Sequence, residues 1–206
     1  MTKKKIFLVT ICIIVILAIV LTILVKKDYK NEKIGNTIIN KSANEVEAYI
    51  LNMSSYQAKM EVTVQSNKNE SKYVIWQEYE KGKKEVQEVK EPENINGLKT
   101  TYENERLIIE NTKLNLTTIY EKYPYLTNNC LWLNSFCEEY QKYGGKIEKT
   151  EQEIHLKVKL EKSENPYIRY KILVIDKNTG KLSKLFVQDI NQKTLVYILY
   201  TEIQIQ

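Results

Sequence analysis

Histidine, arginine and glycine are scarce in this chain of 206 residues, and each scarcity argues against a class of function. His155 is the only histidine, and it falls on the charged face of an expected strand, so we interpret it as solvent-facing rather than catalytic. Arg106 and Arg169 are the only arginines, which argues against nucleic-acid binding, because contacts to phosphate and guanine depend on arginine. The scattered glycines form no phosphate-binding loop. We therefore expect no catalytic, cofactor-binding or metal-binding residues and a protein that is not an enzyme.

A long hydrophobic run near the N-terminus contrasts with these absences. Residues 6–25 carry no charge, and they are bounded by Lys3–Lys5 on one side and by Lys26–Lys27 on the other. At about 1.5 Å per residue, a helix of this length crosses the roughly 30 Å of a bilayer's hydrocarbon core. The sequence predicts an N-terminal tail and transmembrane helix over residues 1–27, followed by a polar linker over 28–36.

This segment is expected to remain attached as an anchor. A secretory signal peptide has a shorter apolar region that ends in small residues, and no such cleavage site is visible. The alternative is a lipoprotein signal acylated at Cys12, which we disfavour because Thr10 and Ile11 precede it instead of a small residue. The N-terminal lysines favour an N-terminus inside the cell, which places the rest of the chain outside the cytoplasm at the cell membrane.

The remaining residues, 37–206, are enough for one domain with a core of its own. Helical spacing of apolar residues predicts helices over 37–53, with a capping box at Ser42 and Glu45, and over 131–143, which ends at Gly144–Gly145. Alternation of apolar and polar residues predicts nine strands, over 56–64, 73–79, 84–90, 98–102, 106–111, 152–161, 167–175, 181–189 and 195–205. Successive hairpins indicate an antiparallel sheet, so the fold class is α+β with helices on one sheet face.

Cysteine and tyrosine each leave two interpretations open. Cys130 and Cys137 are seven residues apart, about 10 Å along a helix, so we prefer two buried free thiols to a bridge in which Cys130 lies outside the helix. The fifteen tyrosines, with Trp76 and Trp132, suit core and sheet-face packing, which we favour, or an apolar groove for a lipid or a protein partner.

Several stretches together resemble the family of the clostridial germination lipoprotein GerS, whose domain is similar to the lipoprotein carrier LolA. The likeness covers most of the chain after residue 37, and it lies in the order of the elements and in the stretches YQAKMEV (56–62), VKEPENINGLKTTYENERLIIEN (89–111), LWLNSFCEEY (131–140), LVIDKNTGKLSKLFVQDIN (173–191) and VYILYTEIQI (196–205). The chain departs from GerS in having no acylatable cysteine.

The resemblance implies a curved antiparallel sheet, a LolA-like half-barrel, with helices on its concave face over residues 37–206. It also implies a non-enzymatic role in spore formation or germination, in which the protein binds and supports an amidase that modifies cortex peptidoglycan. A lipid or lipoprotein carrier at the cell envelope is the alternative, although a permanent anchor disfavours a shuttle. The sequence does not identify the partner-binding surface.

Overall fold

The structure, a computed structural model, describes residues 41–66, 68–123, 130–161 and 165–206. The predicted transmembrane helix over 1–27 and the linker over 28–36 lie outside these residues. Within the described part of the chain, no helix has the length and apolar character needed to cross a bilayer.

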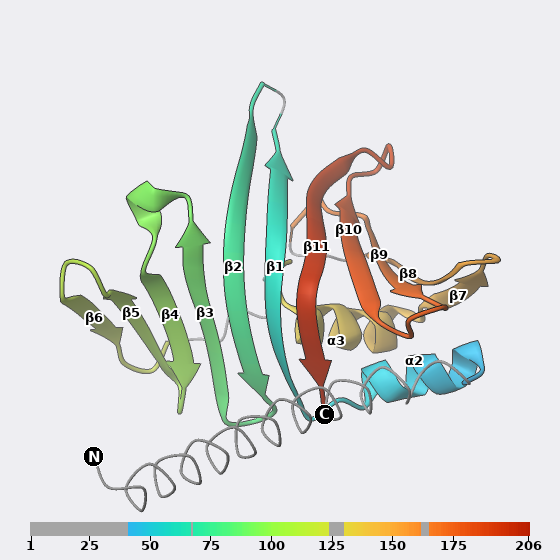
Figure 1. The fold of residues 1–206 in the computed structure, drawn as a ribbon, viewed down its shortest axis with the longest axis horizontal. Helices are drawn as coiled ribbons and strands as arrows, with labels where there is room; N and C mark the ends of the chain where they lie inside the picture. Colours follow the sequence, from blue (N-terminus) through green and yellow to red (C-terminus); the bar gives the residue numbers. More distant parts are fainter. Residues whose placement is uncertain (1–40, 67, 124–129, 162–164) are drawn as a thin grey trace, which may run out of the picture.

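A single antiparallel sheet of eleven strands dominates the described domain (Figure 1). Its spatial order is β6-β5-β4-β3-β2-β1-β11-β10-β9-β8-β7, so the last strand of the chain lies beside the first. The strands are β1 (Ser55–Gln65), β2 (Glu70–Glu80), β3 (Lys84–Glu91), β4 (Leu98–Glu103), β5 (Arg106–Asn111), β6 (Leu116–Tyr120), β7 (Lys146–Lys149), β8 (Glu153–Lys159), β9 (Tyr170–Asp176), β10 (Leu182–Gln188) and β11 (Thr194–Ile205).

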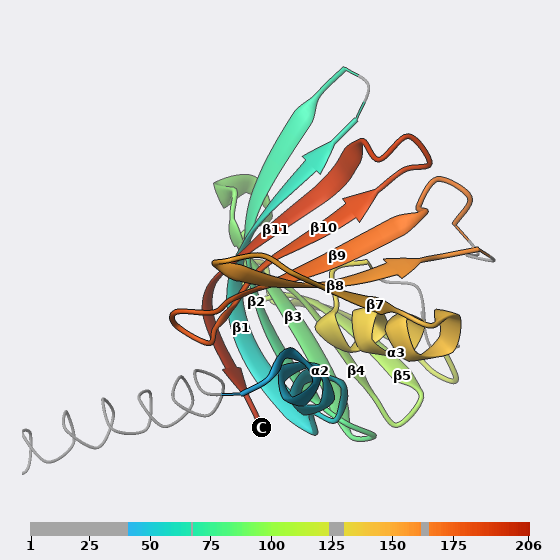
Figure 2. The same ribbon diagram turned by 90° about the vertical axis from the view of Figure 1, so that its right-hand side faces the viewer.

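Two helices, α2 (Ala43–Leu51) and α3 (Leu133–Tyr143), lie inside the curve of the sheet, which bends around them (Figure 2). A short 3-10 turn, η1 (Glu93–Ile95), connects β3 and β4. This arrangement confirms the predicted α+β fold with a curved antiparallel sheet and helices on its concave face.

Alternating burial on β1 shows how the sequence pattern produces this packing. Tyr56, Ala58, Met60 and Val62 are at most 2 % exposed, while the residues between them face the opposite side. Because successive side chains of a strand point to opposite faces, this period of two places one face of β1 against the helices. The core also takes residues from α2, α3, β2 and β8–β11, whereas β3 to β6 contribute none of its buried members.

The described helices are shorter than predicted, since α2 ends at Leu51 instead of residue 53 and α3 begins at Leu133 instead of residue 131, but the predicted end signals at Ser42 and Gly144 are present. The Ser42 hydroxyl accepts a hydrogen bond from the Glu45 N–H at 3.3 Å, and the Glu45 carboxylate accepts one from the Ser42 N–H at 2.7 Å. This capping box starts α2 at Ala43. Gly144 ends α3 in the left-handed conformation at φ 71°, which costs a glycine little.

Two strands were missed by the sequence prediction, which gave nine. β6 is exposed at every position, so it has no buried face to impose an alternating pattern. β7 has only four residues, three of them charged, and pairs with β8 alone. Both are the outermost strands of the sheet, where burial is least and the pattern is weakest.

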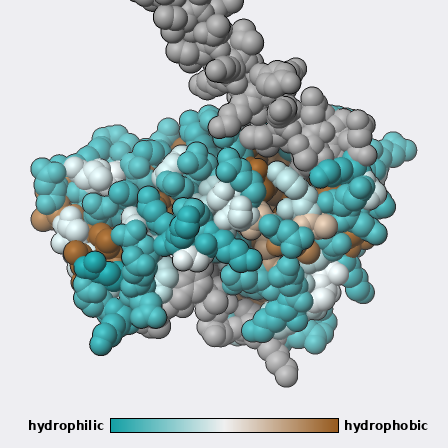
Figure 3. Space-filling view, turned by 90° about the horizontal axis from the view of Figure 1, so that it is seen from below, coloured by the Kyte–Doolittle hydropathy of each residue, from teal (hydrophilic) through white to brown (hydrophobic). Residues whose placement is uncertain are grey.

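The surface is largely hydrophilic when the domain is seen from below (Figure 3). Apolar side chains show at its left-hand end, where β5 and β6 lie in Figure 1, and also in its right half. Four of the seven large apolar residues exposed in the described chain fall between residues 114 and 120, namely Leu114, Leu116, Ile119 and Tyr120. The sheet therefore has one end packed against helices and one end open to solvent.

Candidate binding cleft

A cleft opens in the sheet where β10 and β11 part. β11 pairs with β1 over most of its length, but β10 pairs with β11 only from Lys184, opposite Leu199, to Gln188. Each of these two strands carries a bulge: Ser183 is the extra residue in β10, between Leu182 and Lys184, and Thr201 is the extra residue in β11, opposite the step from Lys59 to Met60 of β1. Because such bulges bend and twist a strand, β11 leaves β10 beyond Leu199.

The separation exposes backbone groups of a central strand. Gln206 and Ser55 exchange hydrogen bonds of 2.9 and 3.1 Å, so the backbone groups of Gln206 face β1. Backbone groups alternate sides along an antiparallel strand, so those of Ile203 and Ile205 face the cleft. The carbonyl of Ile205 accepts a hydrogen bond of 3.0 Å from the Tyr49 hydroxyl. Among the described residues, the N–H and C=O of Ile203 have no hydrogen-bond partner.

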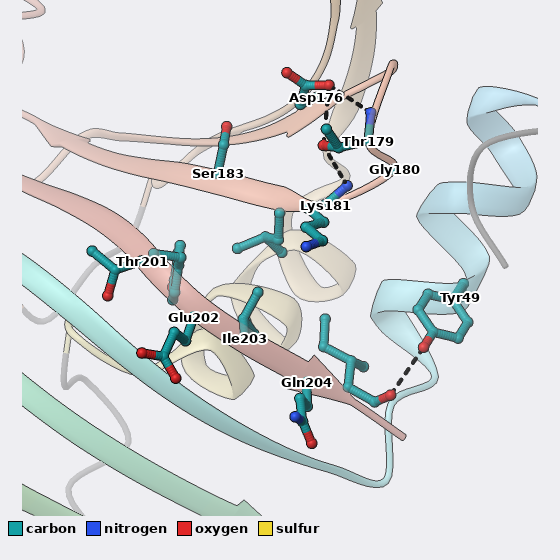
Figure 4. Close-up of a pocket in the computed structure, with 13 residues that line it drawn as sticks. Tyr49, Asp176, Thr179, Gly180, Lys181, Ser183, Thr201, Glu202, Ile203 and Gln204 are labelled. Atoms are coloured by element: carbon teal, nitrogen blue, oxygen red, sulfur yellow. Dashed lines mark hydrogen bonds between the residues drawn. The ribbon is translucent and has the colours of Figure 1, made fainter. Parts of the chain in front are cut away.

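The cleft has a volume of about 330 Å³ and is formed by three elements (Figure 4). The β9–β10 turn, with Asp176, Thr179 and Lys181, forms one wall, and β11 forms the other. Tyr49 of α2 closes one end. Burial raises the pKa of Tyr49, so its hydroxyl stays protonated at neutral pH and donates to Ile205.

The turn wall is held by Asp176. Its carboxylate accepts hydrogen bonds from the N–H of Thr179 at 2.8 Å and from the Thr179 hydroxyl at 3.1 Å. The bond from the Thr179 N–H is the main cause of a lowered pKa at Asp176, which keeps the group ionised at neutral pH. Lys181 and Glu202 add opposite charges to the two walls. The cleft thus offers unpaired backbone groups and charged side chains suited to binding an extended peptide.

The concave interior beneath α3, in contrast, is filled by side chains. Phe136 and Leu133 are fully buried there, and Tyr56 donates a 3.1 Å hydrogen bond to the Gln77 side-chain oxygen. Gln77 in turn donates a 2.9 Å hydrogen bond to Gln87, and Tyr56 accepts one from the Leu133 N–H at 3.3 Å. Four tyrosines are buried in this core, which fits the packing role that we favoured for them: Tyr56, Tyr79, Tyr140 and Tyr200.

The chemical groups singled out in the sequence do not converge on a site. His155 is half-buried on the outer face of the sheet, with Nε2 2.8 Å from a carboxylate oxygen of Glu153. Cys130 and Cys137 are free thiols, as expected, but only Cys137 is buried, and Cys130 is half-buried and precedes α3. Burial raises the pKa of Cys137 to about 12. In the described residues, no group of three or more His, Cys, Asp or Glu side chains is arranged to hold a metal ion.

The sequence did not reveal the cleft. Its one signal was the unequal length of the last two predicted strands, 181–189 and 195–205, which leaves β11 longer than its partner. The bulges that decide where the pairing ends have no distinctive residue pattern, because Ser183 and Thr201 are ordinary strand residues.

Comparison with known proteins places the fold. No protein-family model and no curated protein sequence matches the chain. A chain in the structure of the CwlD amidase from Clostridioides difficile in complex with the GerS lipoprotein is 21% identical, with a TM-score of 0.50, over 79% of this chain and 93% of that one. An uncharacterized conserved protein from Thermus thermophilus is 11% identical, with a TM-score of 0.50, over 81% and 88% of the two chains. The LolA superfamily protein NE2245 from Nitrosomonas europaea is 9% identical, with a TM-score of 0.41, over 81% of this chain and 94% of that one. The described domain has a GerS-like, LolA-like fold, as the resemblance in sequence predicts.

Proposed function

We propose that this chain is a membrane-anchored, non-enzymatic binding protein that docks an amidase of spore-cortex peptidoglycan outside the cytoplasm. Residues 6–25 would supply the anchor, and the domain from residue 41 onward would bind the partner. The observation that carries the proposal is the cleft beside β11, where the backbone groups of Ile203 have no partner within the described part of the chain. The fold likeness to a chain from an amidase–lipoprotein complex supports the choice of partner.

Docking would proceed by strand addition. An extended segment of the amidase would pair with the N–H and C=O of Ile203, each hydrogen bond contributing about 0.5–1.5 kcal/mol net. Lys181 and Glu202, on opposite walls of the cleft, would select a segment with complementary charges. A lipid carrier is less well supported, because Phe136 and Leu133 beneath α3 are fully buried by other side chains and so are not accessible to a lipid.

Binding between the detergent-solubilised full chain and the recombinant cortex amidase of the same genome tests the proposal. Lys181→Glu reverses a charge in the cleft and should weaken binding at least tenfold, and the matched control Lys193→Glu, on the exposed β10–β11 turn, should bind like the wild type. Ile203→Pro removes an N–H that faces the cleft and not β1, so it should also weaken binding.

The outcomes separate the two parts of the proposal. Failure of the wild type to bind the amidase would refute the proposed partner. Equal binding by the wild type and both cleft variants would refute the cleft as the docking site. Circular dichroism of each variant shows whether the fold is intact, and Lys181→Glu keeps the test decisive if Ile203→Pro misfolds.

A further inference from the structure

The outer edge of β6 also carries backbone groups that have no partner strand among the described residues. In the described sheet, β6 is the last strand and pairs only with β5. All five of its residues are exposed, and none is charged. Leu116 is 61% exposed and Ile119 is 48% exposed. An uncharged edge strand with exposed large apolar side chains is what soluble proteins normally avoid, because it pairs readily with another strand.

The opposite edge of the same sheet has the usual protection. β7 is four residues long and carries Lys146, Glu148 and Lys149, and α2 lies against it. Charges on a short edge strand discourage pairing with another chain. β6 has neither a lysine, a proline nor a bulge, so the lack of protection is specific to this edge.

The register of the neighbouring hairpin shows which groups of β6 face outward. Asn104 and Glu105 form a two-residue turn with φ of 50° and 61°, closed by Glu103 opposite Arg106. The closing residues of such a turn direct their backbone groups at one another, and the direction then alternates along the strand. Counting from Arg106, residues 107, 109 and 111 of β5 face β6, opposite 120, 118 and 116. The backbone groups of Thr117 and Ile119 consequently point away from the sheet.

We propose that this edge binds the β6 edge of a second copy of the chain, forming a symmetric antiparallel dimer centred on Thr118. In that register Thr117 lies opposite Ile119 of the second copy, and the reverse, so four backbone hydrogen bonds form. Leu116 lies opposite Tyr120 on one face, which gives an aromatic–aliphatic pair on each side of the dyad.

Self-complementarity favours a second copy over an unrelated strand. A two-fold interface requires one surface to match itself, and residues 116–120 do so, with Leu116 opposite Tyr120, the uncharged Thr117 opposite Ile119, and no charges opposed. The contact is short of the roughly 1,200–2,000 Å² that stable interfaces bury, so the dimer should be weak and reversible in solution. The inference is independent of the proposed amidase, because it uses a different strand.

Disulfide trapping tests the register directly in the full chain with Cys12 replaced by alanine. Thr118→Cys places the two new thiols opposite each other at the dyad, with Cβ atoms about 4.5–5.5 Å apart. Glu121→Cys is the matched control, since Glu121 is also exposed and directly follows β6. In the proposed dimer its thiols are six residues out of register, roughly 20 Å apart. Mild oxidation should cross-link Thr118→Cys at least tenfold faster than Glu121→Cys.

Sedimentation from micromolar to near-millimolar protein provides a second measurement. The wild type should shift from monomer to dimer, and Thr117→Pro should remain monomeric, because its lost N–H faces outward and the pairing with β5 is spared. Thr117→Lys, which keeps every backbone group, should act in the same direction by adding a charge to the edge. The proposal is overturned if the wild type is monomeric throughout, if both variants dimerise normally, or if the two cysteine variants cross-link at equal rates.

Discussion

Replacement of Lys171 should destabilise the domain strongly, because this lysine is buried, whereas lysines usually lie at the protein surface. Lys171 lies on the concave side of β9 and is 1% exposed. Its Nζ is 2.5 Å from a carboxylate oxygen of Glu139 on α3. The pair joins the helix layer to the sheet, and the ion pair is the only polar contact of that Glu139 oxygen among the described residues.

The two partners differ in burial, so their removal should differ in cost. The Lys171 side chain is 2% exposed, and that of Glu139 is 12% exposed. Removing one partner of a buried pair costs about 3–5 kcal/mol, because the other charge is left without compensation. Glu139→Leu leaves the more buried charge, that of Lys171, without a partner, so its cost should reach the upper part of this range. Lys171→Met leaves a carboxylate that can turn toward water, so it should cost about 3 kcal/mol or less.

The double variant Lys171→Met with Glu139→Leu decides whether the charges or only the packing matter. With both charges removed, stability should return to within about 1–2 kcal/mol of the wild type. Urea unfolding of the wild type, the two single variants and the double variant in mild detergent, followed by the fluorescence of Trp76 and the buried Trp132, gives the four free energies of unfolding. The reasoning is refuted if each single substitution costs less than about 1 kcal/mol or if the two costs simply add.

Three further predictions concern the Asp176 carboxylate, the glycine pair that ends α3, and the Cys137 thiol. Asp176→Asn should cost about 0.5–1 kcal/mol at pH 7, a low value because the carboxylate is partly solvated. Since the pKa of Asp176 is lowered in the folded state, its stabilisation is present above the unfolded pKa and is lost as pH falls through the folded one, so urea midpoints of variant and wild type should converge in acid. Gly145→Ala should cost more than about 2 kcal/mol, because an added Cβ would lie 2.1 Å from the buried Tyr140 ring, whereas Gly144→Ala, with φ 71° and open space, should cost about 1 kcal/mol by the same denaturation measurement. Cys137 should not react with a thiol reagent at pH 8 in the folded chain and should react fully in urea, because burial raises its pKa to about 12; rapid labelling in the native state, located by peptide mapping, would contradict the placement of α3.

Local features of the fold were predictable because they depend on residues near in sequence. The capping box at Ser42 involves two residues three apart, and the alternation from Tyr56 to Val62 reports one strand's burial. Gly144 ends α3 as a glycine at this position usually does. The resemblance to a LolA-like family then predicted how these elements assemble, which periodicity alone does not determine.

Features that depend on distant partners were not predictable. Lys171 occupies an inward position of its strand, yet only the approach of Glu139 from another element makes that position tolerable for a charge. The cleft depends on where the ladder between β10 and β11 stops, and this follows from two bulges on different strands. β6 lacked a burial pattern because its exposed edge leaves nothing to bury.

The two proposed contacts use different strands of one sheet and do not compete. The cleft lies beside β11 and the dimer edge lies on β6, with five strands between them in the sheet order. At about 4.8 Å per strand, this spacing is roughly 29 Å along the curved sheet. A dimer formed through β6 would therefore keep both clefts open. Substitutions at Thr117 should abolish self-association and leave amidase binding unchanged, while Lys181→Glu should do the reverse, and coupling between the two measurements would show that they share a surface.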